Sequence, residues 1–120
     1  MKEGSIILTP VPQADGKLKL RPALVLRIMP AYNDLLVCGI STQIHHFILG
    51  FDEIVKTTDN DFKKSCLIQA SLIRLSFLAI IQEKNITGSI GNISNERHKR
   101  LLKNLSTFLL KGIGKCRINY

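Results

Sequence analysis

Two apolar runs, at residues 23–26 and 35–40, have the length and the β-branched content of buried strands. The segment between them, residues 30–34, reads Pro-Ala-Tyr-Asn-Asp and is rich in turn residues. This pattern predicts an antiparallel hairpin. The start of its first strand then lies opposite the end of its second strand. We therefore expect Arg21 to face the sequence Ser41-Thr42-Gln43 at one end of the hairpin.

Shorter elements are predicted on either side of this hairpin. Residues 5–8 read as a strand that ends at the Pro-Val-Pro step of residues 10–12, because proline cannot donate to a ladder. Residues 13–19 are predicted as an exposed loop and residues 47–51 as a third strand. A charged connection over 52–64 precedes a long apolar run within 67–81, which is predicted as a central strand with room for a bend. Residues 86–90 read as a short last strand.

The period of the apolar residues changes to that of a helix after residue 93. Ser94 is a good N-cap, and apolar residues then recur at three-and-four spacing for about four turns. Gly112 and Gly114 are expected to end this helix, whose outer face carries Lys99, Arg100 and Lys103, with Arg97 at its margin. The elements together predict a mainly β (α+β) fold, a small antiparallel barrel with a C-terminal amphipathic helix.

Length and composition narrow the class of protein. The 120 residues fit a single domain spanning 1–120, and no apolar run approaches the ~20 residues of a membrane span. The N-terminus lacks the apolar stretch of a signal peptide, so a cytoplasmic location is expected. The three cysteines have neither CxxC nor zinc-site spacing, and the His45-His46 pair reads as a solvated loop, so no metal or other cofactor is expected.

The charge balance points to a polyanionic partner. Seventeen basic residues against nine acidic ones give a net charge of +8. Lys17, Lys19, Arg21 and Arg27 cluster around the first strand of the hairpin, and a second basic group follows residue 96. A merely solvated surface is the alternative, but basic residues beside the candidate site favour RNA or DNA as the partner.

An arginine that faces hydroxyl groups suits phosphodiester chemistry. The guanidinium group stays cationic and matches phosphate oxygens in a bidentate way. When the 2′-hydroxyl of RNA attacks the adjacent phosphorus, negative charge grows on the non-bridging oxygens, and a fixed cation with hydroxyl donors stabilises that charge. Platforms for base stacking are few, because Trp is absent; Tyr32, Phe47 and Phe51 are the aromatic residues expected near the site.

Residues 7–26, which include Arg21-Pro22-Ala23, and the later Ile40-Ser41-Thr42-Gln43 resemble the PemK/MazF-like toxins. The likeness continues at residues 51–54, 71–74 and 88–91, and so covers nearly the whole chain. The resemblance implies an SH3-like/CcdB-like barrel that is usually a homodimer. It also implies the toxin of a type II toxin–antitoxin pair, a metal-independent endoribonuclease that cleaves single-stranded RNA and is held by an acidic antitoxin.

Site residues follow from the same resemblance. Arg21 matches the family's characteristic arginine, as phosphate binder and proton donor, and Ser41 matches a position that usually carries threonine. Thr42 completes this catalytic set, and Gln43 is a candidate for backbone or base contacts with the substrate. Lys17 and Lys19 are further substrate-binding candidates.

Two alternatives stay open at this point. On the structural alternative, Arg21 does no more than pair with Asp15 or Asp34, and Ser41 and Thr42 do no more than end a strand. On the functional alternative, the chain is a non-catalytic protein with the same barrel, one that binds nucleic acid or targets gyrase as the CcdB-like poisons do.

Overall fold

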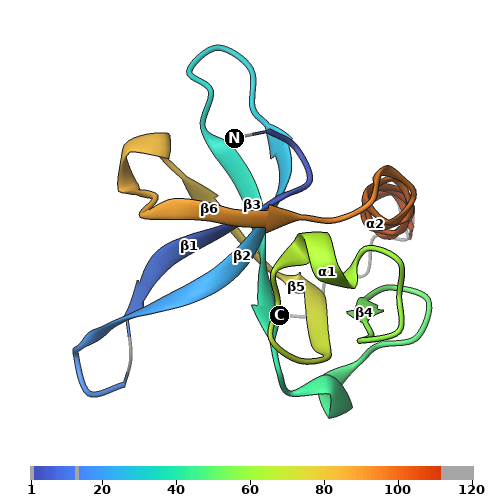
Figure 1. Cartoon of the computed structure of the whole chain (residues 1–120). Coiled ribbons are helices and arrows are strands. Elements are labelled where there is room, and N and C mark those ends of the chain that lie inside the picture. Colours follow the sequence, from blue (N-terminus) through green and yellow to red (C-terminus); the bar gives the residue numbers. More distant parts are fainter. Residues whose placement is uncertain (1, 13, 112–120) are drawn as a thin grey trace, which may run out of the picture.

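The chain folds around one curled antiparallel sheet of six strands, with a helix packed beside it (Figure 1). The computed structural model describes residues 2–12 and 14–111, and its strands follow the order β4-β5-β3-β2-β1-β6. The sheet forms a half-barrel, which confirms the predicted mainly β class with a C-terminal helix.

The strands are β1 (Ser5–Pro12), β2 (Leu18–Ile28), β3 (Leu35–Ser41), β4 (Glu53–Val55), β5 (Ser71–Ile81) and β6 (Gly88–Asn92). The helical elements are η1 (Ile44–His46), α1 (Phe62–Ser65), η2 (Glu83–Asn85) and α2 (Asn95–Leu110). None of the helices within this described part is long and apolar enough to span a membrane.

Strands β2 and β3 form the predicted hairpin. They pair antiparallel with Ala23 opposite Gly39, and a 2.7 Å hydrogen bond from the backbone N–H of Met29 to the carbonyl of Asp34 closes the connecting loop. Successive side chains of a strand point to opposite faces, and both faces of β2 are buried. Two core clusters result, which explains why β2 reads as a continuous apolar run. The first includes Leu24, Leu26, Ile73, Leu75, Leu101 and Leu105, and the second consists of Ile7, Ala23, Val25, Leu35 and Val37.

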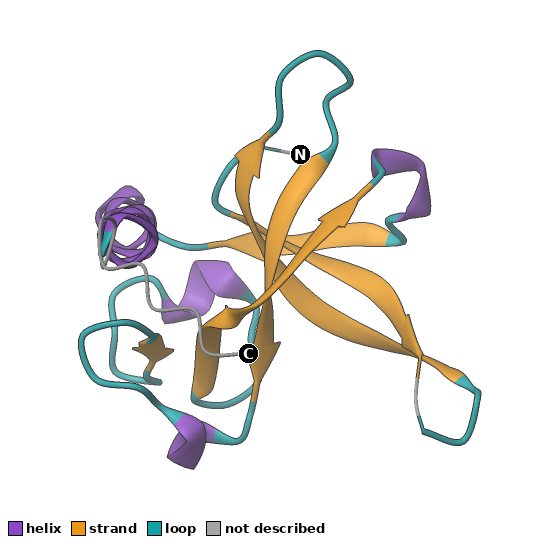
Figure 2. Ribbon diagram, turned by 180° about the vertical axis from the view of Figure 1, so that it is seen from behind, coloured by secondary structure: helices purple, strands orange, loops and turns teal. Residues whose placement is uncertain are grey.

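Strand β1 does not end where the prolines predicted. It continues to Pro12, with Pro10 opposite Leu20 and Pro12 opposite Leu18. The prediction failed because β6 pairs only with the first half of β1, up to Leu8, so the second half has a single neighbour. A proline whose nitrogen faces the open side of such a strand removes no ladder hydrogen bond. The β1–β2 hairpin therefore extends as an arm away from the body of the sheet (Figures 1 and 2). Lys19, expected in a loop, lies within β2.

The third strand predicted at residues 47–51 is wrong. This segment follows η1 as a series of turns, and the next strand, β4, begins only at Glu53. Leu49 is exposed rather than buried, and Gly50 has a φ of +77°, which no regular strand contains. Buried Asp52 fixes the segment, because its carboxylate accepts a hydrogen bond from the backbone N–H of Ile48 at 3.1 Å.

Strand β5 is long and interrupted, as the sequence allowed. Cys38 of β3 lies opposite Leu78, whereas the next residue, Gly39, lies opposite Arg74. Three residues of β5 are therefore inserted between two consecutive positions of β3, which is a bulge larger than the usual single extra residue. Buried Leu75 at the start of the bulge donates its backbone N–H to Asp52 Oδ1 at 3.0 Å. The carboxylate thus replaces the lost ladder partner.

Helix α2 begins after the predicted N-cap and has the predicted length of about four turns. Ser94 caps it by accepting a 3.2 Å hydrogen bond from the backbone N–H of Arg97, and the helix ends at Leu110. The glycines expected to end it, Gly112 and Gly114, lie outside the described residues. Leu101 and Leu105 are its buried apolar residues and reach the first core cluster.

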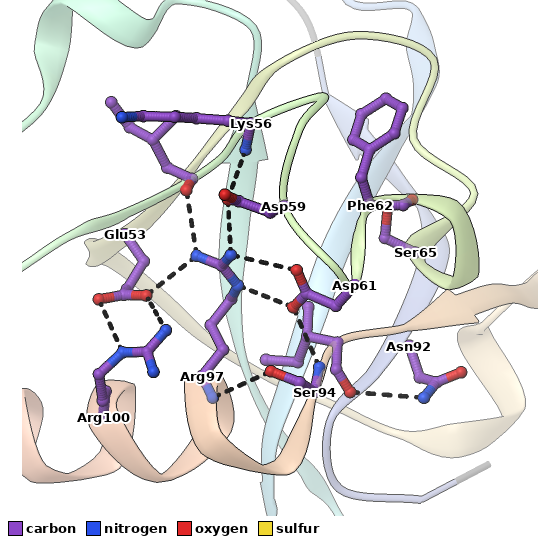
Figure 3. Close-up of polar contacts among 12 residues, drawn as sticks. Glu53, Lys56, Asp59, Asp61, Phe62, Ser65, Asn92, Ser94, Arg97 and Arg100 are labelled. Atoms are coloured by element: carbon purple, nitrogen blue, oxygen red, sulfur yellow. Dashed lines mark hydrogen bonds and ion pairs between the residues drawn. The ribbon is translucent and has the colours of Figure 1, made fainter.

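Arg97 is not at the margin of an outer face, contrary to the prediction; its side chain is 7% exposed. It donates hydrogen bonds to the carboxylates of Glu53, Asp59 and Asp61 at 2.8–3.1 Å, and to the carbonyl of Ile54 at 3.0 Å (Figure 3). A buried arginine needs such partners, because an unpaired charge in the interior is costly. We call Arg97 with Glu53, Asp59 and Asp61 the Arg97 cluster. It fastens the first turn of α2 to β4 and to the loop before α1.

Candidate functional site

Arg21 and Ser41 lie on one pocket, as the hairpin geometry required. The ladder of β2 and β3 ends at Ala23 opposite Gly39, and Arg21 and Ser41 each follow two residues beyond this last pair, at the same end of the hairpin. Both residues line a pocket of about 1060 Å³, together with Thr42 and Gln43. This volume lies slightly above the usual range for small-ligand pockets, about 300–1,000 Å³.

The hydroxyl group of Ser41 is oriented by the chain that follows it. Its Oγ accepts a hydrogen bond from the backbone N–H of Gln43 at 3.0 Å. A hydroxyl group has one proton to donate besides its acceptor lone pairs, so this hydrogen bond does not use the proton of Ser41. The side chain of Thr42 is exposed at the same rim.

The pocket contains a second cation that the sequence reasoning did not assign. Arg74 of β5 lines it and lies opposite Gly39 in the ladder, two positions before Ser41 along β3. The lining residues that the structure describes include Arg21 and Arg74 but neither aspartate nor glutamate. The only signal in the sequence was the segment 71–74 of the family resemblance. The relation of Arg74 to the site depends on the register in which β5 pairs with β3, which the sequence does not reveal.

The structural alternative for Arg21 finds no support in the described residues, where Arg21 forms no ion pair. Asp15 instead accepts a hydrogen bond from the backbone N–H of Lys17 at 2.9 Å. Lys17 and Lys19 are exposed on the β1–β2 arm and do not line the pocket. Of the predicted substrate-binding residues, only Gln43 does.

Several basic residues outside the pocket are already paired. Arg27, expected beside the site, forms an ion pair of 2.8 Å with Glu3, and Arg100 pairs with Glu53 at 3.0 Å. Together with Arg97, these side chains add less to an anion-binding surface than the sequence predicted. Lys99 and Lys103 on α2 are exposed.

Other candidate groups have structural roles or lie elsewhere. Burial raises the pKa of the Cys38 thiol, and nearby Asp52 raises it further, so this buried residue of the pocket stays protonated. His45 and His46 are exposed neighbours in η1, and the described residues contain no group of three or more His, Cys, Asp or Glu that could hold a metal ion.

The aromatic residues expected near the site, Tyr32, Phe47 and Phe51, do not line the pocket. Its aromatic side chain is that of Phe77.

The sequence matches the family model described as the PemK-like, MazF-like toxin of type II toxin–antitoxin systems, over residues 2–109. The match covers nearly the whole chain, from before β1 to the last turn of α2. The chain therefore belongs to this family of toxins. No curated protein matches the sequence significantly.

Proposed function

We propose that this toxin is an endoribonuclease that cleaves single-stranded RNA through attack of the 2′-hydroxyl on the adjacent phosphorus. The observation that carries the proposal is one pocket that holds two arginines, Arg21 and Arg74, and the hydroxyl of Ser41, with no carboxylate among its described lining residues. Such a pocket attracts a phosphodiester and stabilises the charge of its transition state.

The bonds and protons balance without a co-reactant. The 2′-oxygen bonds to phosphorus and releases its proton to solvent water, the bond from phosphorus to the 5′-oxygen breaks, and that oxygen takes up a proton from a donor that solvent then reprotonates, so no net proton is consumed. The products are a 2′,3′-cyclic phosphate and a 5′-hydroxyl. Arg21 binds the phosphate and, as the family resemblance implies, supplies the proton to the leaving oxygen. Arg74 stabilises the non-bridging oxygens, because two fixed cations match their growing charge.

The hydroxyl residues position the reacting phosphate. Ser41 accepts a hydrogen bond from the backbone N–H of Gln43, and its own proton is the one that donates to the phosphate. Serine lacks the methyl group that restricts the rotamers of threonine, and this hydrogen bond supplies part of the missing restriction. Thr42 and Gln43 contact the sugar–phosphate backbone or a base from the rim, while Lys17 and Lys19 on the projecting arm attract the strand more generally.

We further propose that the chain acts as a cytoplasmic homodimer whose activity an acidic antitoxin blocks. Exposed apolar side chains beside the pocket, Leu18 at 68% and Ile68 at 93% exposure, support a protein partner. A segment that is acidic and folds on binding complements a pocket whose charged residues are arginines.

Incubation with a long unstructured RNA in EDTA tests the nuclease. Wild-type protein and a Lys99→Ala control cut the RNA, whereas a folded Arg21→Ala variant leaves it intact. Intact RNA with all three proteins, together with salt-sensitive binding, would favour a non-catalytic nucleic-acid binder. A stable complex with gyrase and no cleavage would favour the CcdB-like alternative.

A further inference from the structure

The bulge in β5 presents an aromatic ring at the pocket. Phe77 is the last of the three inserted residues, so it lies outside the regular ladder between β3 and β5. Its side chain is 51% exposed although it is among the largest apolar groups of the chain. It lines the same pocket as Arg21 and Arg74.

One side of this ring is supported by the backbone of Gly39. A Cβ atom built on Gly39 would lie only 3.0 Å from Cδ1 of Phe77, so the ring occupies the space that a side chain at position 39 would need. A glycine at this position therefore leaves room for the ring beside the strand, in the pocket that both residues line. Phe77 nevertheless stays half exposed at this pocket, so part of its side chain is open to a ligand.

We propose that Phe77 is the platform on which a nucleobase of the bound RNA strand stacks. The inference rests on the proposed function, because it requires single-stranded RNA in this pocket. Aromatic rings that bind bases in this way combine with cations that track the backbone. Phe77 lies three residues from Arg74, at most about 10 Å along the strand, which one nucleotide can span from its phosphate to its base.

The surroundings of the ring suit a base better than a second phosphate. The lining beyond Phe77 is apolar, with Ala79, Ile80 and Ile81 from the same strand. The side-chain amides of Gln82 and Asn85 follow at the end of the pocket, where they can donate to and accept from the edge of a base. The pocket thus has cations at one end, which match the phosphate of a nucleotide, and apolar residues at the other end, which match its base.

The experiment exploits the absence of tryptophan from the chain. The Phe77→Trp variant has one indole at the proposed platform. The Tyr32→Trp variant has one in the loop between β2 and β3, at a residue that is 87% exposed and does not line the pocket. Each is titrated with a single-stranded 2′-O-methyl RNA, which has no 2′-hydroxyl to attack. Binding is followed independently by the anisotropy of a label on the RNA.

Stacking predicts that binding quenches the emission of Phe77→Trp and leaves that of Tyr32→Trp unchanged. It also predicts that Phe77→Leu binds the RNA about 5- to 150-fold more weakly than wild type, whereas Phe77→Tyr binds normally. The leucine variant keeps the inference testable if the tryptophan variant does not fold.

The outcomes separate this inference from the function on which it rests. Binding with unchanged emission of Phe77→Trp, and equal affinity of Phe77→Leu, overturns the stacking alone. Emission that changes with protein concentration but not with RNA assigns the ring to an interface with a second copy, and also overturns it. Quenching without any cleavage of unmodified RNA supports the stacking and overturns the nuclease. No RNA binding by the wild type overturns both.

Discussion

Arg97 Nε donates a hydrogen bond of 2.8 Å to Asp61 Oδ2, and both side chains are buried although one lies in α2 and the other precedes α1. The same carboxylate oxygen accepts from the backbone N–H of Ser94 at 3.1 Å, at the N-cap of α2. The helix is therefore attached to the sheet at its first turn by charge-assisted hydrogen bonds, and along its length by apolar packing.

Removing Arg97 is expected to destabilise the protein severely. Arg97→Ala leaves buried Asp61 without its cation, and we expect the free energy of unfolding to fall by about 3–5 kcal/mol. Arg100→Ala is the matched control, because Arg100 comes from the same helix and pairs with Glu53 but is 53% exposed. Its loss should cost about 1 kcal/mol or less in chemical denaturation. Equal effects of the two substitutions would contradict a structural role for the Arg97 cluster.

The cluster also predicts a specific dependence of stability on acid. Burial raises the pKa of Asp61, but the hydrogen bonds and charge of Arg97 outweigh it and lower the pKa from 3.8 to about 2. The ionised carboxylate thus stabilises the fold at pH values above 3.8, and this contribution is lost as the pH falls through 3.8 towards 2. We expect a loss on the order of 2 kcal/mol from this group. Denaturation of wild type and Asp61→Asn between pH 5 and pH 2 measures it, and identical slopes in the two proteins would refute it.

Asp52 is expected to stabilise the part of β5 that lines the pocket. Its carboxylate satisfies the backbone N–H groups of Leu75 and Ile48, and the bulge that it holds follows Arg74 and includes Phe77. Asp52→Ala leaves two backbone donors without partners, so stability should fall by about 1–3 kcal/mol. RNA cleavage should fall further than stability explains, because the bulge shifts. Glu83→Ala removes an exposed carboxylate as a control. Full activity of a destabilised Asp52→Ala would contradict the link to the pocket.

Arg74 is expected to matter for catalysis, although no role could be assigned to it from the amino-acid pattern. Replacement by glutamine keeps hydrogen-bond donors but removes the charge, and we expect kcat/KM for RNA cleavage to fall by about 10²–10³. Arg74→Lys should retain more activity than Arg74→Gln, since the cation remains. Arg27→Gln is the control, because Arg27 pairs with Glu3. An Arg74→Gln variant as active as this control would remove Arg74 from the proposed mechanism.

The parts of the fold that sequence predicted are those set by local patterns. Both faces of β2 are buried, so its apolar run identified it, and Ser94 with its three-and-four spacing identified α2. The errors arose where residues distant in the sequence determine the local structure. Pro12 remains in a strand because β6 is too short to cover it, and residues 47–51 are not a strand because Asp52 binds Ile48 and Leu75.

The candidate site was predictable only in its hairpin half. The antiparallel rule places Arg21 near Ser41 without knowledge of the rest of the sheet. Arg74 joins them through the register of β5 against β3, and Phe77 through a three-residue shift of that register. Nothing in the apolar run around them signals either. Arg97 looked like a surface cation because its three carboxylate partners lie 36–44 residues earlier in the chain.

The most direct test of the proposed mechanism compares an RNA oligonucleotide with the same oligonucleotide 2′-O-methylated throughout, both in EDTA, with wild type and Arg21→Ala. Cleavage of the unmodified RNA by the wild type alone, leaving 5′-hydroxyl and 2′,3′-cyclic phosphate ends, is the predicted result. Cleavage of the 2′-O-methyl RNA, 5′-phosphate ends, or full activity of Arg21→Ala would contradict it.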